Sequence, residues 1–144
     1  MTGTSQHIID FFEALTPGQV QHLGDIYASD AYFKDPFNEV HGLAPIQDVF
    51  RHMYGSLEAP RFHVTECVAH GGQCFLVWEF RFRFKNSDRE QTLRGCSHLK
   101  LGADGRIAWH RDYWDAAEEI YEKLPLLGTL MRWLKKRTAG TKSA

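Results

Sequence analysis

The segment from residue 78 to residue 85 alternates strictly between large aromatic and charged side chains. The aromatic positions are Trp78, Phe80, Phe82 and Phe84, and the charged positions are Glu79, Arg81, Arg83 and Lys85. Because successive side chains of a strand point to opposite faces of a sheet, this pattern is typical of a β-strand. An aromatic face belongs by default to a protein core. The face with Trp78, Phe80 and Phe82 therefore predicts the wall of an apolar cavity.

Three further strands are expected around this one in the second half of the chain. Residues 61–70 and 73–85 predict two strands that join near Gly71-Gly72. Residues 91–101 and 106–114 predict two more, and Ala103-Asp104-Gly105 between them is a strong hairpin signal. Four long antiparallel strands follow from this order.

The first half of the chain has the periodicity of helices instead. Short amphipathic helices are predicted from Ile8 to Leu15, from the cap residue Thr16 to Tyr27, and over 45–55, with a short strand at 31–37. A final helix is expected from about Asp115, its cap residue, with a break at Pro125. Helices followed by a run of strands predict the α+β class, with a curved sheet wrapped around the N-terminal helices.

Composition limits the kinds of partner. At 144 residues the chain predicts one domain over 1–137, followed by a polar tail at 138–144. Lys and Arg number 17 and Asp and Glu 18, so the net charge of −1 gives no electrostatic case for nucleic-acid binding. Three cysteines in strand-like segments indicate a reduced, cytoplasmic setting, and no signal peptide or membrane-spanning run is apparent.

Two acidic residues are set among aromatic residues near predicted strand ends. Asp35 stands in Tyr-Phe-Lys-Asp-Pro-Phe and Asp112 in Arg-Asp-Tyr-Trp-Asp. Burial disfavours a carboxylate anion, so acids in such surroundings are candidates for proton transfer. The structural alternatives are a turn cap at the Asp-Pro bend for Asp35, and for Asp112 a pair with Arg111 or a backbone amide.

His110 lies two residues before Asp112, so both side chains share one face of a strand. The pair predicts either a polarised catalytic group or a satisfied hydrogen bond in the core. Which face is buried stays open, because Ile107 and Trp109 on the opposite face are also apolar. His110, Asp112 and Asp35 could supply three metal ligands if they converged. The sequence has no dense Cys/His motif, however, and no metal is predicted.

Two segments carry a resemblance to a known family. They are 26–36 (Ile-Tyr-Ala-Ser-Asp-Ala-Tyr-Phe-Lys-Asp-Pro) and 104–115 (Asp-Gly-Arg-Ile-Ala-Trp-His-Arg-Asp-Tyr-Trp-Asp). With the order of elements, they resemble the SnoaL-like proteins of the nuclear-transport-factor-2-like superfamily. The resemblance covers about residues 5 to 123 and implies a cone-shaped α+β fold. It also implies that His110, Asp112 and Trp114 point inward.

Better-known members of the superfamily suggest roles for single residues. In ketosteroid isomerase the general base matches Asp35, but Phe11 and Ser97 stand where its two oxyanion donors would be, so steroid isomerisation is not expected. Asp112 matches a catalytic aspartate of limonene-epoxide hydrolase and the late acid–base aspartate of SnoaL-type cyclases. The catalytic candidates are therefore Asp35, Asp112 and His110. The expected ligand contacts are Phe11, Phe33, Trp78, Phe80, Phe82, Ser97 and Trp114.

The resulting expectation is a domain that binds a small hydrophobic molecule and carries out cofactor-free acid–base catalysis of isomerase, hydrolase or cyclase type. The alternative is a non-catalytic ligand-binding or dimerising module. The resemblance implies a homodimer through the sheet face that bears Arg94, His98 and Lys100. The basic amphipathic segment Leu126–Arg137 predicts a packed terminal helix, with peripheral membrane contact as the alternative.

Overall fold

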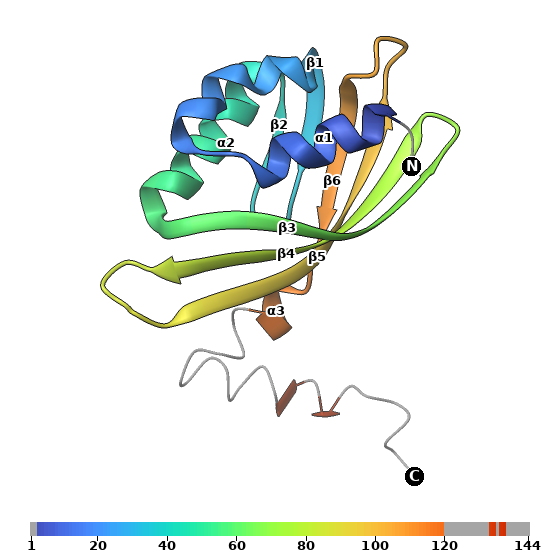
Figure 1. Cartoon of the computed structure of the whole chain (residues 1–144). Coiled ribbons are helices and arrows are strands. Elements are labelled where there is room, and N and C mark those ends of the chain that lie inside the picture. The colour runs from blue at the N-terminus through green and yellow to red at the C-terminus, as the bar shows by residue number, and fades with distance from the viewer. Residues whose placement is uncertain (1–2, 120–132, 135, 138–144) are drawn as a thin grey trace. The chain divides into compact units, whose positions relative to one another are not determined.

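The computed structural model describes residues 3–119, 133–134 and 136–137. The chain divides into two compact units, Met1–Tyr113 and Trp114–Ala144. Within the described residues, the first unit contains one curved, unclosed sheet of six strands in the order β2-β1-β6-β5-β4-β3 (Figure 1). The strands are β1 (Tyr27–Lys34), β2 (Glu39–His41), β3 (Leu57–His70), β4 (Gln73–Phe84), β5 (Glu90–Leu101) and β6 (Ile107–Tyr113).

Strands β3 to β6 form the predicted antiparallel run, in which each strand pairs with the next. Strand β1 pairs with β6 in parallel and with β2 in antiparallel fashion, so the sheet is mixed. Helices α1 (Gly3–Glu13) and α2 (Leu43–Ser56) lie over one face of the sheet (Figure 1). The α+β class with N-terminal helices against a curved sheet is therefore confirmed.

The second predicted helix differs from the expectation. Residues Pro17–Asp25 form a 3₁₀ helix, η1, and the side chain of Thr16 makes no capping hydrogen bond. Tyr27 already belongs to β1, and the carbonyl oxygen of Ile26 accepts a hydrogen bond from the amide of Ile107. Pairing with β6 thus ends the helix early, because the backbone of this segment finds its partners in another strand.

The first strand was predicted too late in the chain. It spans Tyr27–Lys34 rather than 31–37, because residues from Asp35 to Asn38 form a turn in which the Asp35 amide donates to the Asn38 carbonyl at 2.9 Å. The short strand β2 that follows this turn was missed. The Asp-Pro turn ends the strand before the bend, whereas the strand's early start comes from the pairing of Tyr27 with Ile107 of β6.

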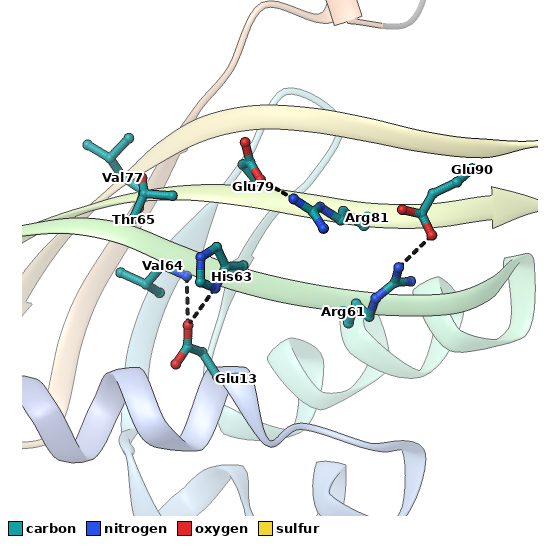
Figure 2. A network of polar contacts seen from close by, with 9 residues as sticks. All are labelled: Glu13, Arg61, His63, Val64, Thr65, Val77, Glu79, Arg81 and Glu90. Atoms are coloured by element: carbon teal, nitrogen blue, oxygen red, sulfur yellow. Dashed lines mark hydrogen bonds and ion pairs between the residues drawn. The ribbon is translucent and has the colours of Figure 1, made fainter.

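The alternating segment behaves as predicted up to its last residue. Trp78, Phe80 and Phe82 are 6%, 6% and 2% exposed, so they form part of the core. Phe84 stands at the end of β4 and is 44% exposed. The charged positions lie on the other face, where Glu79 and Arg81 pair at 2.8 Å (Figure 2).

Strand β3 is an edge strand, and α1 supplies a partner for one of its backbone groups. The register of β3 against β4 shifts between Val64 and Glu66. At this irregularity the carboxylate of Glu13 accepts a hydrogen bond from the Val64 amide at 2.9 Å and lies 3.4 Å from Nδ1 of His63 (Figure 2). The contact fixes Val64, whose side chain faces the interior, beneath the end of α1.

The described part of the second unit is short. It contains helix α3 (Ala116–Glu119), where the Asp115 side chain accepts a hydrogen bond from the Glu118 amide at 3.1 Å, as expected of a cap. Residues 133–134 and 136–137 are helical, and the Arg137 guanidinium lies 5.2 Å from the Trp133 ring centroid. The rest of the predicted Leu126–Arg137 helix and the tail at 138–144 lie outside the described residues. Within the described residues, no helix has the length and hydropathy needed to span a membrane.

Candidate functional site

A cavity of about 30 Å³ lies inside the first unit, between the sheet and the helices. Six of its lining side chains are apolar and three are polar. They are Phe12, Phe50, Phe62, Val64, Leu76, Trp78, Ser97, His110 and Asp112. A space of this size holds one or two water molecules or the end of a small ligand.

The polar side chains form one hydrogen-bonded chain at the sheet. The indole Nε1 of Trp78 donates to Oγ of Ser97 at 2.8 Å, and that hydroxyl donates to Oδ1 of Asp112 at 2.5 Å. Nε2 of His110 lies 2.5 Å from the same carboxylate oxygen. Since an indole only donates, the direction of hydrogen bonding through Ser97 is fixed toward the carboxylate.

Tyr27 ends this chain on the far side of the imidazole. Its hydroxyl lies 2.6 Å from Nδ1 of His110, and the two rings stack with centroids 5.9 Å apart. Burial, and secondarily the charge of Asp112, raise the pKa of Tyr27 well above its ordinary value. The hydroxyl therefore keeps its proton, and His110 lies between this hydroxyl at Nδ1 and the Asp112 carboxylate at Nε2.

Sheet register brings Trp78, Ser97, His110 and Asp112 together from three strands. Ser97 pairs with Asp112 and Leu99 with His110 across β5 and β6, while Trp78 of β4 pairs with Gly95 of β5. The pairing shifts between Lys100 and Leu101, where β6 has one extra residue. This bulge puts both Ile107 and His110 on the buried face and Trp109 on the other. It explains why strict alternation left the buried face of β6 undecided.

The structure brings together only some of the predicted site residues. Asp112, His110, Ser97 and Trp78 line the cavity. Phe33, Phe80 and Phe82 are buried but are not among its lining residues, although the Phe33 ring lies 4.7 Å from that of His110. Phe11 is only half-buried, and its neighbour Phe12 occupies the cavity wall. Trp114 belongs to the second unit.

Several lining residues were missed from the sequence. Phe12 and Phe50 lie in segments that were predicted only as amphipathic helices, and Phe62, Val64 and Leu76 were not singled out. Tyr27 was assigned to the stripe of a helix, although it is the strand residue that contacts His110. The signal that could have identified Tyr27 is a tyrosine among aliphatic core residues, because its hydroxyl needs a buried partner.

Asp35 has its carboxylate in the turn that follows β1. Oδ1 accepts hydrogen bonds from the amides of Phe37 and Asn38 at 2.8 and 2.7 Å, and both oxygens contact the Asn38 side-chain amide. This is the arrangement of a side chain that caps its own turn. Asp35 is not among the residues that line the cavity.

The Asp35 turn gives a testable stability difference. Asp35→Ala removes both backbone contacts and is expected to lower the free energy of unfolding by about 1–2 kcal/mol. Asp35→Asn keeps an acceptor oxygen at the same place and should cost less than half of that. Urea unfolding of both variants measures the difference. Equal stability of the two would contradict a capping role.

No metal-binding group emerges from the described residues. Clusters of three or more His, Cys, Asp or Glu side chains in an arrangement that could hold a metal ion are absent from this part of the chain. The three cysteines are free. Burial raises the pKa of the Cys74 thiol to about 11, so this cysteine behaves as a core residue.

Comparison with known proteins gives one family and many similar folds. A family model described as a SnoaL-like domain matches residues 8–110. Among curated proteins, no sequence matches the chain.

Solved structures resemble the fold over most of the chain. An NTF2-like protein of unknown function from Burkholderia pseudomallei has 20% identity and a TM-score of 0.73, covering 83% of this chain and 96% of that one. A hypothetical protein with a ketosteroid isomerase-like fold from Catenulispora acidiphila, in complex with trimethylamine, has 13% identity and a TM-score of 0.71, with coverages of 83% and 91%. An LEH-like epoxide hydrolase from M. tuberculosis has 15% identity and a TM-score of 0.65, with coverages of 92% and 93%. At these identities the likeness shows the fold alone.

Proposed function

The chain belongs to the SnoaL-like domain family, and from this premise we propose that it binds a small apolar molecule and catalyses acid–base chemistry without a cofactor. Asp112 is the proposed base. Solved structures that share this fold include a putative SnoaL-like polyketide cyclase and an LEH-like epoxide hydrolase. Proton transfer by a positioned side chain is a common source of catalysis in enzymes.

One observation carries the proposal. Asp112 is the only carboxylate among the residues that line the cavity, and its two oxygens have different surroundings. Oδ1 contacts Ser97 and His110, whereas Oδ2 has no partner among the described residues. An oriented carboxylate with one open oxygen in an apolar space is suited to take a proton from a bound molecule.

In the proposed reaction Oδ2 of Asp112 takes a proton from an acidic C–H group of the substrate, or from a water molecule that attacks it. In the first case the electron pair left on carbon is delocalised into an adjacent carbonyl group of the substrate. In the second case the water oxygen forms a bond to an epoxide carbon while the ring C–O bond breaks, and the ring oxygen becomes the site that takes up the proton. The resulting carboxylic acid returns its proton to the product, so that the enzyme ends unchanged. Ser97 and His110 hold the carboxylate in place throughout, because each donates to Oδ1 rather than to the substrate side.

Proton exchange with solvent tests this function before a substrate is known. We would incubate the protein in D₂O with small ketones, unsaturated ketones and epoxides, and follow deuterium uptake and product formation by NMR. Catalysed exchange or conversion of at least one class is expected. Detectable binding of these molecules without any exchange or conversion would favour the non-catalytic binding module. One observation supports that alternative. Asp35 does not line the cavity, so the cavity contains one carboxylate rather than the two that were expected.

A homodimer is also proposed, through the outer face of the sheet. This face bears Arg94, His98 and Lys100, as predicted, together with exposed apolar side chains. Phe75 and Val77 are exposed there, and the Phe75 ring stacks on that of His98 at 4.3 Å. Apolar side chains gathered on an exposed sheet face favour burial against a second copy.

The oligomeric state tests this second proposal. Sedimentation velocity at micromolar concentration should give a dimer for the unaltered chain and a monomer for Val77→Arg, because the new charge would be buried in the interface. Gln19→Arg, at an exposed position of η1, is the matched control and should remain dimeric. A monomer for the unaltered chain would remove the proposal.

A further inference from the structure

We propose that the molecule bound in the cavity carries a positive charge next to its apolar part, as a small alkylammonium ion does. This inference deepens the proposed binding function and rests on it. It comes from the charge of the cavity and from the kind of side chain that surrounds it, two features that do not depend on which reaction is catalysed.

The cavity has a carboxylate at its polar end and no Lys or Arg among its lining residues. Of the nine lining residues only Asp112 and His110 can carry charge. The His110 imidazole lies between two groups, with Nδ1 2.6 Å from the Tyr27 hydroxyl and Nε2 2.5 Å from the Asp112 carboxylate. The Asp112 side chain is only 16% exposed. Its charge thus lies in surroundings where water screens it poorly.

A neutral apolar ligand fits this end badly. Filling the cavity would remove water from Oδ2 of Asp112, and a hydrocarbon gives no hydrogen bond in return. An ammonium group replaces that water with an N–H donor and a balancing charge. A tetraalkylated ammonium still supplies the charge. The polar end therefore favours a cation over an uncharged molecule of the same shape.

The remaining walls suit a cation as well. Four aromatic side chains line the cavity and contact one another in T-shaped or stacked pairs, with ring centroids 5.8–6.4 Å apart. They are Phe12, Phe50, Phe62 and Trp78. Aromatic faces attract alkylammonium groups through the ring quadrupole, and contact with the methyl groups buries apolar surface at the same time.

Trp78 is held in a fixed position for this contact. One side of its ring lies over Gly95, so closely that a Cβ there would stand 2.4 Å from Cη2. Its Nε1–H is used by Ser97. A ligand in the cavity can therefore contact the remaining π surface of the indole, but it cannot accept a hydrogen bond from Nε1–H. The cavity volume of about 30 Å³ limits the ligand to a small ion or to the ammonium end of a longer molecule.

Binding of matched probes tests the inference. Tetramethylammonium and methylammonium chloride would be titrated into the full chain, alongside tert-butanol, a neutral molecule with as many heavy atoms as tetramethylammonium. The indole N–H signal of Trp78 in ¹H–¹⁵N NMR spectra reports occupancy of the cavity. At least one ammonium probe should bind ten times more tightly than tert-butanol, or better.

Three variants identify the source of this preference. Asp112→Asn should weaken ammonium binding at least tenfold and leave tert-butanol within about twofold, whereas Asp30→Asn, which removes an exposed carboxylate from β1, should change neither. Phe62→Leu keeps an apolar wall but removes one ring. It should weaken ammonium binding by roughly two- to thirtyfold, the range of a cation–π contact.

The following outcomes would contradict the inference that the ligand is a cation. Equal binding of tert-butanol and the ammonium probes, ammonium binding that survives Asp112→Asn, or no ammonium binding at all would overturn the inference. None of these results decides the proposed catalysis, because exchange and turnover of neutral substrates are measured separately. Conversely, tight ammonium binding without any turnover would support the cation and leave the protein a binding module.

Discussion

Asp112→Asn is expected to reduce turnover, or deuterium exchange into a bound substrate, by a factor of about 10² to 10⁴. The asparagine oxygen can still accept hydrogen bonds from Ser97 and His110, so the hydrogen-bonded chain and the fold should survive. The group that changes is the one at the position of Oδ2, where an amide nitrogen replaces a proton acceptor. Loss of the proton acceptor, and not loss of shape, is therefore the reason for the effect.

Two controls make this result interpretable. Asp30→Asn removes the same charge from an exposed position of β1 and should retain full activity. Urea unfolding and circular dichroism should show that Asp112→Asn keeps the folded structure. An Asp112→Asn protein that is folded and fully active would rule out Asp112 as the base.

Local sequence patterns predicted the parts of the fold that depend on local periodicity. The alternation at Trp78, Phe80 and Phe82 predicted the buried face of β4, and the helical periodicity over 45–55 predicted α2. Prediction failed where pairing partners far along the chain decide the structure. Tyr27 has the spacing of a helix residue, yet it lies in β1, whose pairing with β6 supplies the hydrogen bonds of its backbone.

The candidate site could be predicted in part, for a related reason. Asp112 and His110 are two residues apart on one strand, so their shared face followed from the sequence. The partners that hold them, Tyr27 and Ser97, come from two different strands, and no pattern within either strand reveals the pairing register. Asp35 stood out from its aromatic neighbours, but those neighbours did not reveal that the turn amides bind its carboxylate.

The largest expected effect on stability comes from a residue without a side chain. Gly95→Ala should lower the free energy of unfolding by about 1–3 kcal/mol, although alanine is normally at least as good as glycine in a strand. A Cβ at residue 95 would lie 2.4 Å from Cη2 and 2.6 Å from Cζ2 of Trp78. These atoms belong to a rigid, buried ring, so the whole indole must move. Its hydrogen bond to Ser97, the donor to Asp112, would be strained or lost.

A double-mutant cycle separates this steric effect from a general loss of strand stability. Trp78→Phe shortens the ring that meets the new methyl group, so Gly95→Ala should cost at least 1 kcal/mol less in that background than in the unaltered chain. Gly55→Ala in α2 is the matched control: a Cβ there meets nothing within 4 Å, and alanine should be neutral or stabilising. Urea unfolding gives all of these values. If the cost of Gly95→Ala is the same with Trp78 and with Phe at position 78, the indole is not held by the glycine, and the geometry of Asp112 must be set by Ser97 and His110 alone.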